Sequence, residues 1–397
     1  MHFLKSILKK SQFAVSTNAC LKRYIQEYRA ARDLKQYQRE AARLNINCPQ
    51  GEYLQRALQL RLAERAQGRW PKRKGSLHLF LAYYVSNWEV ILPVALTPFG
   101  RVTAFNWREH GFRDSAPDWL DHRDDMNKEM LATFHRANRE QPVDAVISYL
   151  SGYNTSRQTL TEMAKCGAAI FNFCWDDKLN FPGKRIGGRY PSPAEIASVV
   201  DLNLTNSPDS LIKYAVHGGL AMFWPEAAHP DVHRHYDVPF EFDVSFVGAC
   251  YGWRPAFMRQ LARRGIKVAC FGKGWPNGPL DDENMIKLYS RSRINLGFSS
   301  IGYAKRLMCL KGRDFEIPMS GGLYLTQHNP ELTLVYRVGE EILTYRGVED
   351  CAATIRSLLD NPLRAAEIRA KGRARALREH TYETRWGNVF KRSGIMC

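Results

Sequence analysis

KGRDFEIPMSGGLYLTQHNPEL, residues 311–332, carries the strongest local signals for the fold of this chain. Its first part predicts a helix that ends at Gly321 and Gly322, where a left-handed backbone is needed. Residues 323–326 are apolar and partly β-prone, as in a buried parallel strand. Asn329-Pro330-Glu331 predicts another helix start, with Asn as the cap and Pro at the first position. The stretch therefore predicts one helix–strand–helix unit of a parallel α/β sheet.

Arg313 and Glu316 lie three residues apart in the first of these helices, so they share one helical face. Beside the glycine turn, a cation and a carboxylate could bind one ligand together. The alternative is an exposed ion pair within the helix, which contributes only about a few tenths of a kcal/mol. From the residues alone, the ion pair is the simpler interpretation.

Length and composition predict a globular protein with a full core. The chain has 397 residues, 45% of them hydrophobic, which suggests two domains or one large α/β unit. No run reaches the roughly 18 apolar residues of a membrane span, and residues 1–13 lack the apolar core of a signal peptide. The nine Cys show neither CxxC pairs nor Cys/His ligand spacing. We therefore expect reduced thiols and a cytoplasmic location.

The net charge of +17 is concentrated at the N-terminus. Residues 1–75 contain 17 Lys and Arg but five Asp and Glu, and two helical stretches separated by residues 45–51. We predict a basic helical N-terminal extension, most simply a solvated arm. The alternative is a surface for anionic lipid or nucleic acid. An apolar face beside lysines allows a short interfacial helix at Phe3, Leu4, Ile7 and Leu8, whereas no helix-turn-helix or RNP-like signature favours nucleic acid.

Residues 76–240 predict a first α/β domain. Strand-like runs at 77–83, 101–105, 144–150, 168–173 and 201–206 alternate with helical sequence, which is typical of a parallel sheet with right-handed crossovers. Ligands of such sheets bind beyond the carboxyl ends of the strands. The loops 84–88, 151–155 and 174–178 should meet there. They bring Tyr153, Asp176 and Asp177 to this edge.

Two polar clusters in this domain have alternative interpretations. Asp176 and Asp177 are either a general base and an anchor for substrate hydroxyls, or a turn pair with solvated carboxylates. His229, His233 and His235 suggest a metal site. Flanking prolines, and the lack of a carboxylate at helical ligand spacing, favour a linker with exposed histidines.

Residues 241–385 predict a second α/β domain, with strands near 242–247, 266–270, 293–298, 323–326 and 342–345. Gly248 lies in the loop before a helix that begins near Arg254, an arrangement that points backbone N–H groups at an anion. Gly272 follows the next strand and allows close approach of a ligand. Lys305 follows the third strand. Residues 386–397 are predicted to be a tail.

This second domain resembles the GT-B glycosyltransferases, specifically the CgeB-like group of glycosyl transferases group 1. The resemblance rests on motifs that keep their order and spacing over about 140 residues, namely DVSFVG at 243–248, RDFEIP at 313–318, SGG at 320–322, EEILTY at 340–345 and EHTY at 379–382. FWPEAA at 223–228 is similar to that family's entry into the second domain.

The resemblance implies two Rossmann-like domains across a cleft and transfer of a sugar, most simply a hexose, from a nucleotide-diphospho-sugar. The donor would bind the second domain, and a polysaccharide, glycolipid or protein acceptor the first, through Tyr153 and Asp176. No metal or other cofactor is implied. The resemblance assigns Glu316 to the ribose hydroxyls. The remaining donor-binding residues that it implies are Gly248, Arg254, Gly272, Lys305, Arg313, Gly321 and Gly322.

One position departs from the family pattern. Many retaining relatives have a second glutamate eight residues before the one that matches Glu316, and here that residue is Met308. The stereochemical outcome therefore stays open. An inverting reaction needs a base from the first domain, for which Asp177 is the candidate. A non-catalytic scaffold that binds polyanions through residues 1–75 is the alternative function.

Overall fold

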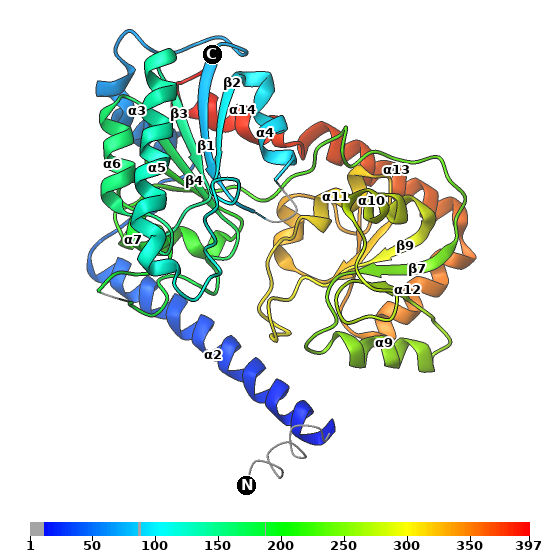
Figure 1. Cartoon of the computed structure of the whole chain (residues 1–397). Coiled ribbons are helices and arrows are strands. Elements are labelled where there is room, and N and C mark those ends of the chain that lie inside the picture. The colour runs from blue at the N-terminus through cyan, green and yellow to red at the C-terminus, as the bar shows by residue number, and fades with distance from the viewer. Residues whose placement is uncertain (1–11, 86–88, 187) are drawn as a thin grey trace. The chain divides into compact units, whose positions relative to one another are not determined.

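The protein divides into two compact units, seen here in a computed structural model that describes residues 12–85, 89–186 and 188–397 (Figure 1). The first unit comprises Asp33–Pro225 and Tyr382–Cys397. The second comprises Glu226–Thr381 together with the described residues before Asp33. The predicted domain ranges ended at 240 and 385, so the compact units divide the chain differently.

The first unit contains a six-stranded parallel sheet in the order β2-β1-β3-β4-β5-β6. β1 is buried at every position, as expected for a central strand covered on both faces. The strand order reverses between β1 and β3, which is where such sheets bind ligands. The strands are β1 (Leu77–Tyr83), β2 (Gly100–Asn106), β3 (Ala145–Ser148), β4 (Ala169–Cys174), β5 (Leu202–Thr205) and β6 (Ala221–Phe223).

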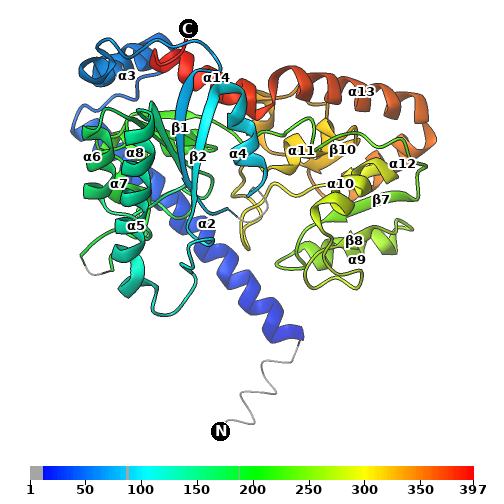
Figure 2. The same ribbon diagram turned by 45° about the horizontal axis from the view of Figure 1, so that its top comes forward.

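Helices cover both faces of this sheet (Figure 2). On one face, Phe80 of β1 packs edge-on against Phe134 of α5 (Trp119–Glu140), with ring centroids 5.4 Å apart. On the other face, Phe390 of α14 (Tyr382–Ser393) contacts Phe171 of β4 at 6.3 Å. The other helices of this unit are α3 (Gly51–Ala66), α4 (Ile91–Leu96), η1 (Thr97–Phe99), α6 (Arg157–Lys165), α7 (Pro193–Ile196), η2 (Pro208–Ser210) and α8 (Leu211–Val216).

The second unit contains a five-stranded parallel sheet in the order β11-β10-β9-β7-β8. Its order reverses between β7 and β9, so the unit repeats the topology of the first. The strands are β7 (Phe242–Val247), β8 (Ala269–Phe271), β9 (Ser292–Leu296), β10 (Tyr324–Gln327) and β11 (Leu343–Tyr345). The helices are α9 (Arg254–Arg263), α10 (Asp282–Arg291), α11 (Arg313–Met319), η3 (Pro330–Leu334), α12 (Val348–Asp360) and α13 (Pro362–Glu379).

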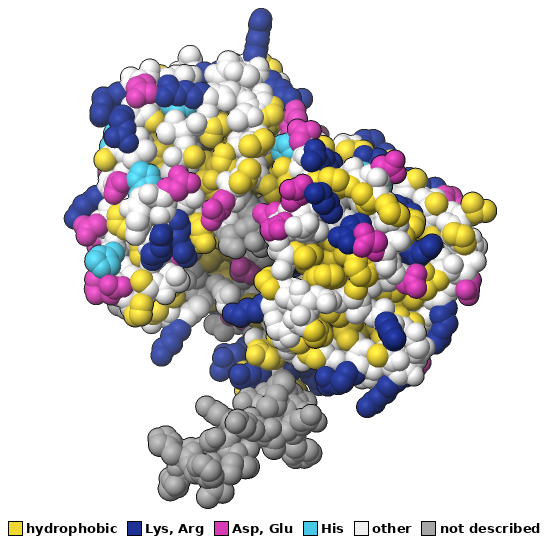
Figure 3. All heavy atoms as spheres, turned by 45° about the vertical axis from the view of Figure 1, so that its right-hand side comes forward, with side chains coloured by type: hydrophobic (Ala, Val, Ile, Leu, Met, Phe, Trp, Pro, Cys, Tyr) yellow, Lys and Arg dark blue, Asp and Glu magenta, His cyan; other side chains and the backbone are white. Residues whose placement is uncertain are grey.

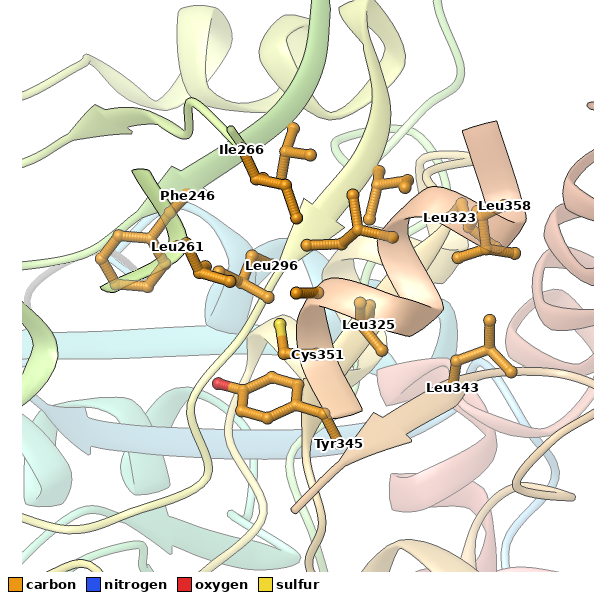
Figure 4. Close-up of a cluster of buried hydrophobic side chains, with 14 of the residues drawn as sticks. Phe246, Leu261, Ile266, Leu296, Leu323, Leu325, Leu343, Tyr345, Cys351 and Leu358 are labelled. Carbon is orange, nitrogen blue, oxygen red and sulfur yellow. The ribbon is translucent and has the colours of Figure 1, made fainter. Parts of the chain in front are cut away.

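One apolar core joins the strands of the second unit to α9 and α12 (Figure 4). Leu261 of α9 and Ile355 of α12 are fully buried against it. The ring of Phe257 stacks on Tyr345 with centroids 5.3 Å apart. Burial of a side chain of this size stabilises the fold by about 1.5–3 kcal/mol. This core fixes the strands whose carboxyl ends carry the candidate site.

The predicted α/β fold with two parallel sheets is confirmed, and two strands, β1 and β7, match their predicted bounds. The helix predicted to start at Asn329-Pro330-Glu331 is the short 3-10 helix η3. The Asn329 side chain accepts a hydrogen bond from the Glu331 N–H, so the predicted cap is present.

The solvated-arm interpretation of residues 1–75 is wrong for the described part beyond residue 33. Leu54, Leu58 and Leu62 of α3 are buried in the first unit. Arg65 pairs with Asp201, and Lys72 lies 2.7 Å from Asp144, so part of the basic charge is neutralised by buried carboxylates. The predicted interfacial helix at residues 3–8 lies outside the described residues.

The first helix of the described chain, α2 (Gln12–Arg43), is shared by the two units. In the first unit, Tyr37 is buried and its hydroxyl lies 3.1 Å from His217 Nε2. On the face drawn in Figure 3, Lys and Arg side chains are interspersed with Asp and Glu over the surface. Within the described residues, no helix has both the length and the apolar character needed to span a bilayer.

Two further expectations are corrected. Residues 386–393, predicted as part of a tail, belong to α14, where Trp386, Val389 and Phe390 are buried. Their spacing of three and four residues is that of a helix that buries one face. His233 is buried rather than exposed, and burial lowers its pKa to about 4. Among the described residues, no three His, Cys, Asp or Glu are grouped as a metal site.

Candidate functional site

The candidate site lies at the carboxyl edge of the second-unit sheet. The loops that leave β7 and β9 meet where the strand order reverses, the usual ligand position in such sheets. Residues 248–253 connect β7 to α9, and residues 297–312 connect β9 to α11. The stretch at 311–332 therefore enters the sheet directly after the second of these loops.

Arg254 and Arg313 are the first residues of α9 and α11, the helices that follow the two loops. Burial lowers the pKa of Arg254, and the charge of the nearby Arg313 lowers it further. Burial alone would lower the pKa of Arg313 too, but Tyr289 and Glu316 raise it above its ordinary value. Among the described residues, neither guanidinium is within ion-pair distance of a carboxylate. Both cations are therefore partly buried, and an anion bound beside either would be stabilised by its charge.

Aromatic rings fix the guanidinium of Arg254. Its central carbon lies 4.4 Å from the ring centroid of Tyr251 and 5.4 Å from that of Phe298. Its Nη1 donates to the carbonyl of Ala249 at 3.2 Å. Rings of this kind hold a cation through their negative faces. The other N–H groups of Arg254 have no hydrogen-bond partner in the described chain.

Glu316 and Asp314 are buried carboxylates on α11. Burial raises the pKa of Glu316, although the neighbouring Arg313 opposes the shift. Within the described chain, no side chain donates a hydrogen bond to Glu316. Asp314 accepts from the Tyr324 hydroxyl and the Lys311 N–H, both at 2.8 Å, and burial raises its pKa to about 6. Asp314 therefore holds the local structure, whereas Glu316 accepts no side-chain hydrogen bond within the described chain. The exposed ion pair considered for Arg313 and Glu316 is wrong, because Glu316 is buried.

Gly248 and Gly272 have a packing reason for being glycine. Gly272 has φ +124°, and a Cβ there would lie 2.5 Å from the carbonyl oxygen of Gly248. The same oxygen accepts a hydrogen bond from Trp275 Nε1 at 2.8 Å. The two loops thus touch through their backbones, so a ligand is not needed to explain either glycine.

Gly321 and Gly322 are likewise surrounded by protein rather than by open space. Gly321 has φ +74°, which confirms the predicted left-handed helix end, and a Cβ there would lie 2.7 Å from Nδ1 of His235. A Cβ on Gly322 would lie 2.8 Å from Nδ2 of Asn295. Close packing against His235 and Asn295 therefore already explains why both residues are glycine, and their assignment to the donor stays a prediction.

Lys305 lies in the β9–α11 loop. Its Nζ is 5.5 Å from the ring centroid of Trp253, next to Arg254 in the chain. Its carbonyl accepts from Gln327 Nε2 at 2.9 Å, and its N–H donates to Glu27 of α2 at 2.7 Å. Four predicted donor residues thus lie at the carboxyl edge of one sheet: Lys305 on the β9–α11 loop, Arg254 at the start of α9, and Arg313 and Glu316 on α11.

In the first unit, the two adjacent aspartates have different surroundings. Asp177 is fully buried and accepts from Ser210 Oγ at 2.7 Å and from the Tyr214 hydroxyl at 2.9 Å. Burial raises its pKa to about 6, although these hydrogen bonds oppose the shift. With both oxygens engaged and no exposed surface, Asp177 is not placed to take a proton from an acceptor.

Asp176 instead lines a pocket of about 160 Å³ at the carboxyl edge of the first-unit sheet, together with Tyr149, Asn180 and Pro191. It is exposed, and the Tyr149 hydroxyl lies 3.4 Å from its Oδ2. A second pocket of about 290 Å³, which also reaches Pro191, is lined by Tyr153 and by two cations, Arg123 and Arg189. The loop 84–88 lies partly outside the described residues.

Sequence reasoning missed several residues of these sites. Tyr251 and Phe298, whose rings contact the guanidinium of Arg254, belong to no recognisable motif, because aromatic residues are common in loops. Lys311 lies within the opening stretch, and its buried Nζ is 3.0 Å from Cys309 Sγ. Glu27, 278 residues before Lys305, could not be connected to it from local pattern. The run 178–190, which has four Lys and Arg and no acidic residue, is the signal that points to Arg189.

Comparison with known proteins agrees with this geometry. Residues 254–391 match the family model described as "Glycosyl transferase-like". This segment begins at α9 and includes Arg254, Lys305, Arg313 and Glu316. No curated protein sequence gives a significant match.

Solved structures are similar over most of the chain. The Anabaena protein Alr3699/HepE in complex with UDP and glucose has a TM-score of 0.54 at 11% identity, over 79% of this chain and 98% of its own. Sucrose-phosphate synthase from Thermosynechococcus elongatus gives the same values. A glycosyltransferase from Rickettsia africae ESF-5 has a TM-score of 0.52 at 10% identity, over 82% and 99%. The chain therefore has the fold of GT-B glycosyltransferases, two Rossmann-like units with parallel sheets, preceded by helical sequence.

Proposed function

We propose that this protein is a glycosyltransferase that moves a sugar, most simply a hexose, from a nucleotide-diphospho-sugar to a polysaccharide, glycolipid or protein acceptor. The proposal rests above all on Arg254 and Arg313, two cations that begin α9 and α11 at the edge of the second-unit sheet and that no described carboxylate contacts at ion-pair distance. A diphosphate is the anion that would suit two guanidiniums, because each can donate two parallel hydrogen bonds. The matched family segment and the fold support the same class of reaction.

The roles of the donor-side residues follow from their chemistry. Glu316 would accept hydrogen bonds from the two ribose hydroxyls, since its buried carboxylate has no donor within the described chain. Arg254, Arg313 and Lys305 would bind the diphosphate and stabilise its negative charge as it leaves. In this assignment protein cations neutralise the leaving group, so the transfer needs no metal ion. Placement in the CgeB-like group is part of the proposal and rests on the motifs at 243–248 and 313–318.

On the acceptor side, we propose Asp176 in place of Asp177. In the transfer, the acceptor oxygen bonds to the anomeric carbon while the bond from that carbon to the diphosphate breaks, and the diphosphate leaves with the electron pair. If the reaction inverts, Asp176 takes the acceptor proton. If it retains, Asp176 orients the hydroxyl, and the departing diphosphate takes the proton. Tyr153 and the pocket with Arg123 and Arg189 would hold the rest of the acceptor.

The direct test is ligand-induced stabilisation of the full-length protein by nucleotide-diphospho-sugars, with and without EDTA. UDP-glucose is the first choice, because Alr3699/HepE, which shares the fold at a TM-score of 0.54, has been solved with it. A donor at 100 times its Kd adds about 2.7 kcal/mol to the free energy of unfolding. We expect stabilisation that EDTA leaves unchanged. No stabilisation by any nucleotide-sugar would contradict the function, and loss with EDTA would contradict metal independence.

Replacing Asp176 with Asn should lower kcat/KM for transfer by about tenfold to 150-fold, the value of a hydrogen bond to a charged group. The melting temperature should not change, because Asp176 is exposed.

Asp177→Asn is the comparison variant at the neighbouring aspartate. It places an amide against the Ser210 and Tyr214 donors and should lower stability by about 1–3 kcal/mol. Its pH dependence has a definite sign, because the raised pKa of about 6 makes wild type lose stability, relative to the Asn variant, as pH rises from about 4 to 6. If Asp177→Asn instead lowered kcat/KM for transfer without loss of stability, and Asp176→Asn left kcat/KM unchanged, Asp177 would be the base.

The described part of the basic extension also supports a membrane partner. α2 exposes Tyr24 and Tyr28, which are 67% and 57% accessible, beside Arg29 and Arg32. Tyrosines with neighbouring cations suit the interface of an anionic bilayer. We propose that this face brings the enzyme to the inner membrane surface, and cosedimentation with vesicles of phosphatidylserine against phosphatidylcholine alone decides it.

A further inference from the structure

The loop that follows β9 is held by side chains from the N-terminal helix. Gln26 Oε1 of α2 accepts a hydrogen bond from the backbone N–H of Tyr303 at 2.9 Å. The next residue, Glu27, accepts through Oε1 from the N–H of Lys305 at 2.7 Å and from the N–H of Arg306 at 3.0 Å. Three backbone donors of one four-residue turn are thus satisfied by two consecutive side chains that lie far away in the sequence.

The surrounding contacts make this turn specific for α2. Gly302 has φ +56°, and a Cβ there would lie 2.9 Å from Oε1 of Gln26. Lys22 places its Nζ 5.2 Å from the ring centroid of Tyr303. On the opposite side of the chain, Gln327 of β10 donates to the carbonyl of Lys305. The backbone of Lys305 is therefore held at two points: its N–H donates to α2, and its carbonyl accepts from the sheet.

The negative charge of Glu27 contributes to holding this turn, in addition to the position of its oxygen. Consecutive backbone N–H groups that point at one place form a concave site for an anion, and hydrogen bonds to a carboxylate are roughly twice as strong as neutral ones. The turn itself carries Lys305 and Arg306, both exposed, so a carboxylate also balances their charge. Without Glu27, the two N–H groups and two cations of this turn would have no negative partner from α2.

We infer that Gln26 and Glu27 are positioning residues of the donor site, which hold the 299–310 loop so that Lys305 reaches the donor. This inference rests on the proposed function. It also gives the N-terminal segment a role: its helix is a structural part of the second unit's site rather than a separate appendage. Neither residue contacts the donor itself, and their effect is transmitted through the backbone of Lys305 and Arg306.

The test compares Glu27→Ala, Glu27→Gln and Gln26→Ala in the full-length protein. Arg39→Ala is the matched control, because Arg39 is exposed on the same helix. The first readout, hydrogen exchange of the amides of residues 303–306, does not depend on activity. We expect exchange at least tenfold faster in Glu27→Ala, an intermediate rate in Glu27→Gln, which keeps the accepting oxygen, and the wild-type rate in Arg39→Ala.

The second readout is KM and kcat for UDP-glucose. We expect a rise in KM of about tenfold in Glu27→Ala, a smaller change in kcat, and a melting temperature close to that of wild type. A merely structural contact would instead lower the melting temperature and leave KM unchanged, which would overturn the inference. Unchanged exchange at 303–306 would also overturn it. If wild type binds no nucleotide-sugar, the proposed function fails, and the exchange measurement still decides whether α2 holds the loop.

Discussion

Replacing Glu316 with Gln is expected to weaken donor binding by about tenfold to 150-fold and, at the same time, to stabilise the fold. The loss of affinity corresponds to about 1.5–3 kcal/mol, the value of hydrogen bonds to a charged acceptor. The gain in stability follows from burial, because the carboxylate is 8% exposed and no side chain of the described residues donates to it. An amide of the same shape avoids the cost of desolvating that charge.

The pH dependence of this stability difference has a definite sign. Burial raises the pKa of Glu316 above its unfolded value. Below the unfolded pKa, both the folded and unfolded forms hold the proton, and no charge is buried. As pH rises through the raised pKa, wild type must ionise a buried group and loses stability. Glu316→Gln does not titrate, so its advantage over wild type should grow with pH across this range.

Affinity and stability are measured on the same samples, by calorimetric titration with UDP-glucose and by urea unfolding at several pH values. Glu340→Gln is the matched control, since Glu340 is an exposed carboxylate of the same unit. It should change neither quantity. If Glu316→Gln loses stability and keeps its affinity, the carboxylate is a structural partner of Arg313, and the ribose assignment is wrong.

The fold could be predicted from sequence because its signals are local. Buried parallel strands are short apolar runs, and the glycine and Asn-Pro signals around residues 321–331 mark where helices end and begin. α14 was missed although Trp386, Val389 and Phe390 have helical spacing. These residues follow the EHTY motif at 379–382, which was interpreted as the end of the second domain.

The candidate site could be predicted only in part, because its details depend on contacts between distant residues. Arg313 and Glu316 were found, but their burial depends on α10 and β10, which no local pattern reveals. Asp176 and Asp177 could not be ranked, since only the packing of α8 shows that Ser210 and Tyr214 hold the second aspartate. The glycines at 321 and 322 were identified correctly as a helix end, but their packing against His235 and Asn295 joins residues far apart in the sequence.

Replacing Asp144 with Ala is expected to lower the free energy of unfolding of the first unit by about 3–5 kcal/mol, the usual loss when one partner of a buried ion pair is removed. The carboxylate is fully buried at the start of β3. It accepts from Lys72 Nζ and from the His78 N–H, both at 2.8 Å, and from Trp70 Nε1 at 3.0 Å. The Ala variant leaves these donors without an acceptor and a cation without its partner.

An exposed pair provides the control. Asp243 lies 3.3 Å from Arg293 at the surface of the second unit, with 69% of its side chain accessible. Asp243→Ala should cost less than about 1 kcal/mol, because water screens such a pair. Both variants are compared by urea unfolding of the full-length protein, with tryptophan fluorescence as the signal.

The double variant Asp144→Ala with Lys72→Met decides what the Asp144 result means. Since the two groups are in contact, the loss in the double variant should be smaller than the sum of the two single losses. Lys72 and Trp70 belong to the segment predicted to be a separate basic extension. Strong coupling would therefore show that this segment is needed to satisfy a buried charge of the first sheet. A protein that lacks residues 1–70 would lose Trp70 and Arg69 from this network. A loss below about 1 kcal/mol in Asp144→Ala, or full additivity, would mean that the extension is only loosely attached.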